Sequence, residues 1–341
     1  MVNASRTALL ATVALSASLA AVAEDARGLL ERMERALATR NFQGTFVHEH
    51  GGQSETLRIV HRVEGGKFAE RVVSLDGSGR EVIRRDGELR AYFPDQRVVL
   101  VESAPKGGLL LSGLSGLDSA AGQIYRLSEE SPTRISGRGA RVIAVEAQDD
   151  LRYGYRVWID EASAMPLKTQ LHTSAGRVIE QLVFTELTLP AHIADAALQP
   201  AVAAHDYRWL RHTAATEVAV SQAADTTWDA AELPPGFRLV ANSTRILGGS
   251  QRAVTHLVFS DGLASVSVFV EPASPAPAAQ RGPAAAPTMT NLGSSSALST
   301  EVDGHKVTAI GEVPPDTVRA IARSLRGGFA PSAGPAPGAQ R

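Results

Sequence analysis

Residues 67–102 read KFAERVVSLDGSGREVIRRDGELRAYFPDQRVVLVE, and this stretch decides the fold class of the first half of the chain. Short β-branched segments at 67–75, 80–85, 88–93 and 97–102 are separated by the turn sequences Asp76-Gly77-Ser78-Gly79, Asp86-Gly87 and Pro94-Asp95. Glycine takes up the positive φ that tight hairpin turns require. Strands joined by such short turns must be antiparallel, because a parallel pair needs a long crossover connection.

The same pattern continues on both sides of this stretch. Strands are predicted upstream at 42–50 and 55–63, and downstream at 141–147, 153–160, 166–173 and 177–189. Residues 103–127 interrupt it with a dense group of leucines whose neighbouring glycines weaken any helix prediction. These leucines are Leu109, Leu110, Leu111, Leu114 and Leu117. The first domain is therefore expected to be an antiparallel meander of about nine or ten strands with one interruption.

A curved sheet of this size needs apolar cover on its concave face. Residues 25–40 place Leu29, Leu30, Met33 and Leu37 at helical spacing, so a helix is one candidate for that cover. The Leu/Gly-rich segment is the other. Met33, Leu37 and the five leucines are candidate lipid-binding residues. The leucine segment is either ordinary core or a displaceable plug over an apolar cavity, where each buried CH₂ of an acyl chain would contribute about 0.8 kcal/mol.

The first 23 residues have the features of a secretory signal peptide. Arg6 is the only charge before Glu24, the intervening residues are mostly apolar, and Ala21-Val22-Ala23 is a small-x-small cleavage sequence. The apolar run is shorter than the ~20 residues that usually span a bilayer. The sequence contains no cysteine, so neither a lipid-modified cysteine nor a disulfide is expected. We expect export to the periplasm with cleavage after Ala23.

Changes in composition divide the rest of the chain. The predicted organisation is a signal peptide at 1–23, a β-rich domain at 24–200, a linker at 201–226, a small α+β domain at 227–326 containing a disordered Pro/Ala-rich loop at 272–298, and a disordered tail at 327–341. Tyr207 and Trp209 are unusual in an Ala-rich linker, which suggests packing at the junction between the domains.

The second domain has its own strand and helix signals. Leu233-Pro234-Pro235-Gly236-Phe237 predicts a rigid opening turn, and Asp261-Gly262 predicts a hairpin. Strands are expected again at 299–303 and 305–313. A helix starting at Pro314-Pro315-Asp316 would place Val318, Ile321, Ala322 and Leu325 on one face.

The residues give little support for catalysis or a cofactor. The formal net charge of −2 offers no basic patch for nucleic acid. Ser103 and Lys106 have S-x-x-K spacing, but Pro105 disfavours the helical turn that this motif needs. His48-Glu49-His50 is the best metal candidate, with His61 as a third ligand from the next strand, yet H-x-H alone is a weak pattern and an exposed polar strand face is the preferred interpretation. No enzyme activity, cofactor or metal is predicted.

Several strings in the chain together resemble the MucB/RseB family of sigma-factor regulators. In the first half these are Phe42-Gln-Gly-Thr-Phe-Val47, Glu55-Thr-Leu-Arg58, Val60-His61, Glu70-Arg71 and Leu75-Asp-Gly77; in the second half they are Leu233-Pro234, Gly236-Phe237, Ser260-Asp-Gly-Leu263, Ser267-Val-Phe269, Gly311-Glu-Val-Pro-Pro315 and Ile321-Ala322. The resemblance covers nearly all of the chain after the signal peptide. Residues 272–298 and 327–341 look longer than the family pattern.

The resemblance implies a fold and a function. The large domain would be an unclosed antiparallel β-barrel with covering helices, similar to LolA and LolB, and the small domain a twisted antiparallel sheet with a helix. The family would bind the periplasmic region of an inner-membrane anti-sigma factor of the RseA or MucA type and protect it from site-1 proteolysis. Lipopolysaccharide or mislocalised lipoproteins would release it. The chain would then be peripheral to the inner membrane through its partner, with homo-oligomerisation left open.

Exposed aromatic and large apolar residues are the best candidates for contact with a protein partner or between domains. They are Tyr207, Trp209, Trp228, Leu233, Phe237, Phe259 and Phe269, of which Phe259 and Phe269 also fit a core role. The alternative function is a periplasmic lipid or lipoprotein carrier of the LolA type. A carrier would need only the first domain, so the second domain favours the regulator.

Overall fold

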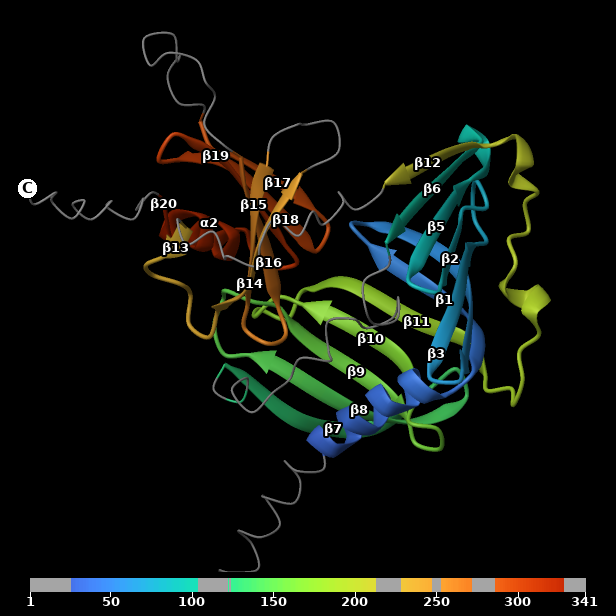
Figure 1. The fold of residues 1–341 in the computed structure, drawn as a ribbon. Coiled ribbons are helices and arrows are strands. Elements are labelled where there is room, and N and C mark those ends of the chain that lie inside the picture. Colours follow the sequence, from blue (N-terminus) through green and yellow to red (C-terminus); the bar gives the residue numbers. More distant parts are fainter. Residues whose placement is uncertain are drawn as a thin grey trace, which may run out of the picture. The chain divides into compact units, whose positions relative to one another are not determined.

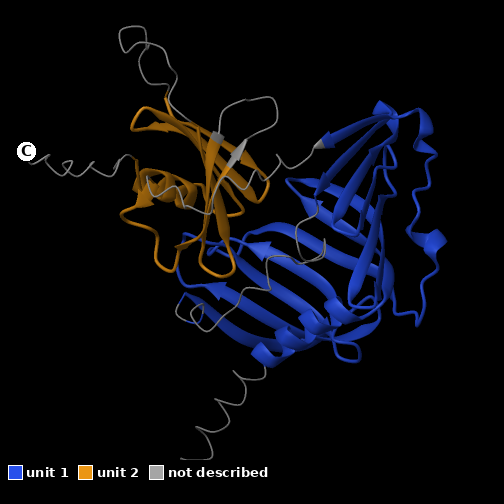
Figure 2. Cartoon of the chain, in the orientation of Figure 1, with its two compact units in different colours: residues 1–214 blue, residues 215–341 orange. Residues whose placement is uncertain are grey.

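The computed structural model describes residues 26–103, 122, 124–212, 228–246, 253–271 and 286–327. The chain divides into two compact units, residues 1–214 and residues 215–341 (Figure 2). The signal peptide predicted at 1–23 and the five leucines of the Leu/Gly-rich segment lie outside the described residues. Within the described ranges, no helix combines the length and apolar character needed to cross a membrane.

The first unit contains one large sheet and an N-terminal helix at residues 26–39 (Figure 1). Its strands are β1 (Phe42–His50), β2 (Gln53–Glu64), β3 (Lys67–Ser74), β4 (Glu81–Arg85), β5 (Glu88–Phe93), β6 (Val98–Ser103), β7 (Tyr125–Ile135), β8 (Arg138–Ala147), β9 (Gly154–Asp160), β10 (Pro166–His172), β11 (Val178–Thr188) and β12 (Arg208–His212). Ten of the twelve were predicted from the sequence to within three residues at each end.

The order of the strands is β12-β6-β5-β4-β3-β2-β1-β11-β10-β9-β8-β7. Hairpins connect the consecutive strands β1 to β6 and likewise β7 to β11, as the turn sequences between the predicted strands indicated, so each of these two groups is a meander. Asp86 and Gly87, for example, have φ of 53° and 78°. The two halves are joined where β1 pairs antiparallel with β11, which places Phe46 opposite Phe184. The sheet is therefore two meanders joined through a long-range pair, rather than the single meander that the sequence suggested. It remains unclosed, because β12 and β7 stand at its opposite ends.

The helix at 26–39 covers one face of this sheet, here called the inner face. Its residues Ala36 and Leu37 pack with side chains from both meanders, including Phe42, Phe46 and Phe184. Met33 is fully buried. The opposite, outer face carries Val60 and Ala69, and these pack against Ile193 and Leu198 from the segment after β11. Strand β2 thus buries side chains on both faces: Leu57 and Ile59 on the inner face and Val60 on the outer face.

Strand β7 was not predicted: the sequence indicated no strand between the interruption at 103–127 and residue 141. β7 is an edge strand, and most of its side chains are exposed or half-buried. Its register with β8 shifts between Glu130 and Thr133, around Pro132. Edge strands and irregular registers tolerate proline, because no neighbour needs its missing N–H. The weak apolar pattern and the proline therefore hid a real strand.

The linker prediction at 201–226 was wrong at its beginning. Residues 204–206 form a 3₁₀ turn, and β12 pairs in parallel with β6, so the first unit continues to at least residue 212. Local patterns could not show this pairing, because β6 and β12 are about a hundred residues apart.

The second unit has a six-stranded antiparallel sheet in the order β14-β15-β16-β19-β18-β17 and a small pair, β13 with β20. The strands are β13 (Trp228–Ala230), β14 (Arg238–Ile246), β15 (Ala253–Ser260), β16 (Ser265–Glu271), β17 (Thr288–Leu292), β18 (Ser295–Val302), β19 (His305–Gly311) and β20 (Leu325–Gly327). Helix α2 (Pro315–Ser324) packs its fully buried Val318 and Ile321 onto the sheet's core.

Two predictions for this unit need correction. The Pro/Ala-rich loop predicted at 272–298 is too long, because β17 and the start of β18 lie inside it. Exposed small and polar residues dominate β17, another edge strand, so its composition resembles that of a loop. Leu325 does not belong to helix α2 but opens β20, so ordered structure extends to Gly327, the first residue of the predicted tail.

Candidate functional site

The inner face of the large sheet is the first candidate surface. Met33 is buried, and Leu37 is half-buried against the apolar cluster of the helix and both meanders. These two residues therefore belong to the packed cover of the sheet. No structural test exists for Leu109, Leu110, Leu111, Leu114 and Leu117, which lie outside the described residues.

A buried polar pair interrupts this apolar face. His61 of β2 and Glu70 of β3 are opposite each other, 4% and 1% exposed, and the His61 Nδ1 lies 2.8 Å from the Glu70 Oε1. The His61 ring is stacked between Phe42 and Phe68, at centroid distances of 4.6 and 5.7 Å. The His61 Nε2 has no hydrogen-bond partner within the described structure. A buried imidazole nitrogen without a partner can bond a polar group that enters the inner face.

From the sequence, His61 was a candidate third metal ligand beside His48 and His50. The structure separates them: His61 is occupied by Glu70, whereas the His48 Nε2 lies 2.8 Å from the Glu180 Oε1 of β11. His48 and His50 share a face of β1, with ring centroids 5.9 Å apart. Over the described ranges, no group of three or more His, Asp or Glu side chains is arranged to hold a metal ion.

Glu180 changes the acid–base behaviour of His48. Its hydrogen bond with His48 raises the pKa of the imidazole, and the negative charges of Glu180 and Glu55 act in the same direction. Burial of the ring opposes the shift. The charged form of His48 is therefore favoured by its surroundings.

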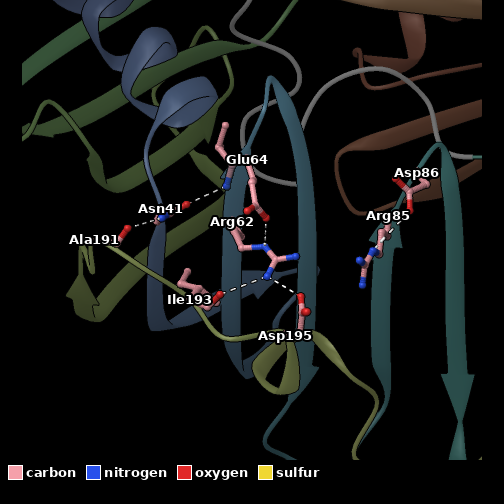
Figure 3. Close-up of polar contacts among 9 residues, drawn as sticks. Asn41, Arg62, Glu64, Arg85, Asp86, Ala191, Ile193 and Asp195 are labelled. Atoms are coloured by element: carbon pink, nitrogen blue, oxygen red, sulfur yellow. Dashed lines mark hydrogen bonds and ion pairs between the residues drawn. The ribbon is translucent and has the colours of Figure 1, made fainter.

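The outer face carries a polar attachment that the sequence did not reveal. Residues 190–206, here called the strap, pack along this face against residues of β2 to β6. Figure 3 shows the polar contacts that hold the first part of the strap, at Ala191, Ile193 and Asp195. Arg62 of β2 donates to the carbonyl of Ile193 at 3.2 Å and to Asp195 Oδ1 at 2.6 Å. The Asn41 side chain donates to the Ala191 carbonyl and accepts from the Val63 N–H. The hydrogen bond from Arg62 holds the pKa of Asp195 below its usual value.

Farther along the strap, Glu81 of β4 forms a buried contact with it. Its carboxylate is 1% exposed and accepts the Ala201 N–H at 3.0 Å and the Arg71 Nε–H at 2.9 Å. A hollow of about 300 Å³ lies next to this point, between Leu198–Pro200 and β4–β5, and Arg85, Arg90 and Tyr92 contribute to its lining. The strap is thus fixed by both apolar and charged contacts.

Tyr207 and Trp209 lie at the end of the strap, in the first unit. Tyr207 packs against the outer-face cluster that contains Ile83 and Tyr92. Trp209, on the edge strand β12, is 43% exposed, meets Tyr92 edge-on at 6.3 Å and donates its indole N–H to the Ala204 carbonyl. Of the aromatic candidates, Trp209 has the largest exposed surface.

The candidates in the second unit are mostly core residues. Trp228, Phe237 and Phe259 are buried in its apolar cluster, and Leu233 packs against it. The absence of a side chain at Gly327 accommodates the Trp228 ring, since a Cβ there would lie 2.5 Å from it. Phe269 is half-buried and stacks on His256 at 4.5 Å. Sequence alone could not tell these buried aromatics from exposed ones, because the burial of an aromatic side chain depends on tertiary packing and not on its sequence neighbours.

Comparison with known proteins assigns both halves of the chain. The family model of the MucB/RseB N-terminal domain matches residues 25–202, and that of the MucB/RseB C-terminal domain matches residues 222–326. The chain is 33% identical over 324 residues to the sigma factor AlgU regulatory protein MucB of Pseudomonas aeruginosa, covering 93% of this chain and 96% of that protein. It is 28% identical over 309 residues to the sigma-E factor regulatory protein RseB of Escherichia coli K12, covering 89% and 91%.

Solved structures agree with this result. The structure of the Pseudomonas aeruginosa MucA/MucB complex superposes with a TM-score of 0.67 and 31% identity, over 90% of this chain and all of that chain. A crystal structure of MucB superposes with a TM-score of 0.57 and 29% identity, over 89% of this chain and 98% of that chain. With two family models in order and a relative above 30% identity over nearly its full length, this chain belongs to the MucB/RseB family of sigma-factor regulatory proteins.

Proposed function

We propose that this protein binds the periplasmic domain of a MucA- or RseA-type anti-sigma factor and protects it from site-1 proteolysis. The observation that carries the proposal is the likeness to MucB solved in complex with MucA, which extends over both units. A regulator that acts by binding needs surface but no catalytic group.

Release of the anti-sigma factor by lipid is the second part of the proposal. The inner face combines an apolar lining from two meanders with one buried histidine nitrogen that has no partner in the described structure. An acyl chain suits the apolar lining, and Met33, Leu37 and the five leucines remain the proposed contacts. If lipid weakens partner binding, bound partner must weaken lipid binding by the same factor.

The proposed location is the periplasm, with the signal peptide at 1–23 removed. The two-unit division and the pairing of β12 with β6 support a large domain that ends after β12. The pairing of Trp228 with Gly327 between β13 and β20 supports a small domain that runs to Gly327. Among the proposed partner contacts, Trp209 has the strongest support because it is the most exposed aromatic; the half-buried Tyr207, Leu233 and Phe269 come next.

A protease-protection experiment tests both parts. The mature protein is mixed with the periplasmic domain of the anti-sigma factor from the same genome, site-1 protease is added, and cleavage is followed with lipopolysaccharide, with a diacylated peptide, or with the same peptide lacking acyl chains. We expect protection that the two lipids relieve and the bare peptide does not.

Cleavage at the same rate with and without the protein would overturn the proposal. If a diacylated peptide still bound in that case, the carrier function would replace it. Protection that no lipid relieves would leave the binding function standing and remove the release mechanism.

A further inference from the structure

Strand β12 (Arg208–His212) forms one edge of the large sheet, with β6 as its only neighbour in the described part of the chain. The Arg208 N–H donates to the Arg97 carbonyl at 2.8 Å, and Arg208 is in register with Val98. In a parallel pair, the N–H and C=O of one residue point to the same side and alternate along the strand. Arg208, Leu210 and His212 therefore bond β6, whereas the N–H and C=O of Trp209 and Arg211 point away from the sheet.

Among the described residues, no proline, register shift or covering segment protects this edge. Exposed edge strands are commonly blunted by proline, by bulges or by a covering segment, because their free N–H and C=O groups can recruit another strand. β12 has no proline and no register shift, and its Trp209 and Leu210 are 43% and 42% exposed on opposite faces. Within the described part of the chain, only the shortness of β12 and its two arginines disfavour pairing with another strand.

The positive charges of β12 favour pairing with a strand that carries carboxylates. The strand contains Arg208 and Arg211 and no carboxylate, in a protein whose net charge is −2. The Arg211 side chain is 65% exposed and lies 3.4 Å from Glu88, which holds Arg90 more closely at 2.5 Å. Arg208 makes no ion pair with any described residue, while Glu102 lies opposite His212 at the far end. The two guanidinium groups thus flank an apolar pair and remain largely available to carboxylates.

We propose that β12 is a docking edge for an extended acidic segment of the anti-sigma factor, which adds a thirteenth strand to the large sheet. The ladder would use the outward N–H and C=O groups of Trp209 and Arg211. Trp209 and Leu210 would contact apolar side chains of the incoming strand, and Arg208 and Arg211 would bind its carboxylates. This inference rests on the proposed function and specifies the surface and the binding mode.

Two substitutions of Arg211 distinguish the contribution of its backbone N–H to binding from that of its guanidinium charge. Arg211→Ala removes the guanidinium and keeps the outward N–H, whereas Arg211→Pro removes both and places a ring on the docking edge. Proline is tolerated on an edge strand where the N–H faces solvent. Leu210 is already extended, as the residue before a proline must be.

The probe is the periplasmic domain of the anti-sigma factor from the same genome, titrated with the full mature protein by calorimetry at low and moderate salt. We expect Arg211→Ala to weaken binding about threefold with a smaller salt dependence, as for an exposed ion pair. Arg211→Pro should weaken it about fivefold further, as for one lost backbone hydrogen bond. Arg208→Glu with Arg211→Glu should weaken it at least about tenfold through like-charge repulsion.

Hydrogen exchange at Val99 and Val101, whose amides face β12, shows whether each variant keeps the β12–β6 pair. Equal affinities of the wild type, Arg211→Ala and Arg211→Pro, with that pair intact, would overturn the inference and leave the proposed function standing. No binding by the wild type would overturn both. A homodimer that Arg211→Pro dissolves, with anti-sigma binding unchanged, would assign the edge to a second copy and also overturn the inference.

Discussion

Gly44, in the middle of β1, shows why a small residue occupies a strand that is otherwise rich in large side chains. A Cβ at this position would lie 2.3 Å from the Glu186 carbonyl oxygen and 3.1 Å from the Phe184 ring. The contact arises where β1 joins β11, the pair that connects the two meanders. The close approach of the backbones at this seam therefore depends on the absence of a side chain.

Replacing Gly44 with Ala should destabilise the first unit by about 1–3 kcal/mol, because the nearest obstacle is backbone and cannot rotate away. Urea unfolding followed by circular dichroism measures the change. Gly28→Ala is the matched control, since a Cβ there meets only the tip of Arg32 at 3.8 Å within the N-terminal helix. That control should be neutral or stabilising by up to about 1 kcal/mol. A neutral Gly44→Ala would contradict the tight seam.

The His48–Glu180 pair predicts a pH dependence of defined sign. The pKa of His48 is raised in the folded state, so the pair stabilises the fold fully below the unfolded pKa of about 6.5 and loses its contribution as pH rises through the folded pKa. Glu180→Gln should lower the pKa of His48 and reduce the stability that is lost as the pH rises above about 6.5.

The pKa of His48 can be followed by NMR titration of its imidazole protons. Glu186→Gln is the control, because it removes an equal charge from an exposed site on the same strand. A His48 pKa that is the same in the wild type and in Glu180→Gln would show that the hydrogen bond does not exist in solution.

The strap is held by two carboxylates that differ in burial, and we expect the buried one to stabilise the first unit more. Asp195 binds Arg62 at the surface, whereas Glu81 binds Ala201 and Arg71 with its carboxylate 1% exposed. Exposed ion pairs contribute little, while removal of a buried acceptor leaves its donors unsatisfied.

Glu81→Ala should therefore destabilise the first unit by about 2 kcal/mol and increase hydrogen exchange of the Ala201 amide. Asp195→Ala, the paired variant, should leave the unfolding free energy almost unchanged. Chemical denaturation gives the energies, and exchange measured by NMR gives the local opening of the strap. A larger loss of unfolding free energy for Asp195→Ala than for Glu81→Ala would show that the exposed contact, and not the buried one, holds the strap.

At the scale of the whole molecule, β12 decides where the large domain ends. The sequence places that end at residue 200, but Tyr207 packs on the outer-face cluster and β12 completes the sheet beside β6. A fragment of residues 24–214 should fold with a cooperative transition. A fragment of residues 24–200 should be less stable by several kcal/mol, because it loses five ladder residues and leaves the β6 edge open.

Thermal unfolding of the two fragments, followed by circular dichroism, compares them directly. Light scattering adds a second measure, since an uncovered β6 should make the shorter fragment aggregate. Equal stability and solubility would show that β12 is an accessory to the sheet and not part of the domain.

Much of the architecture followed from the sequence. Turn sequences such as Asp86-Gly87 fix hairpins locally, so ten strands of the first unit, the helix at its start and helix α2 were predicted close to their observed bounds. The family resemblance also came from the sequence and is confirmed by the domain matches. The edge strands β7 and β17 were missed because exposed, proline-bearing or small-residue segments lack the apolar alternation of a buried strand.

Two β-rich units, their hairpins and the family could be predicted from the sequence, because these depend on local turn geometry and on strings of residues in order. The pairing of distant strands, β1 with β11 and β12 with β6, was visible only in the folded chain. The tertiary structure alone showed that Trp228 is buried and Trp209 exposed, and that His61 is enclosed with Glu70. The physical reason is that pairing and burial depend on which parts of the chain the curved sheet brings together, and no local pattern encodes that.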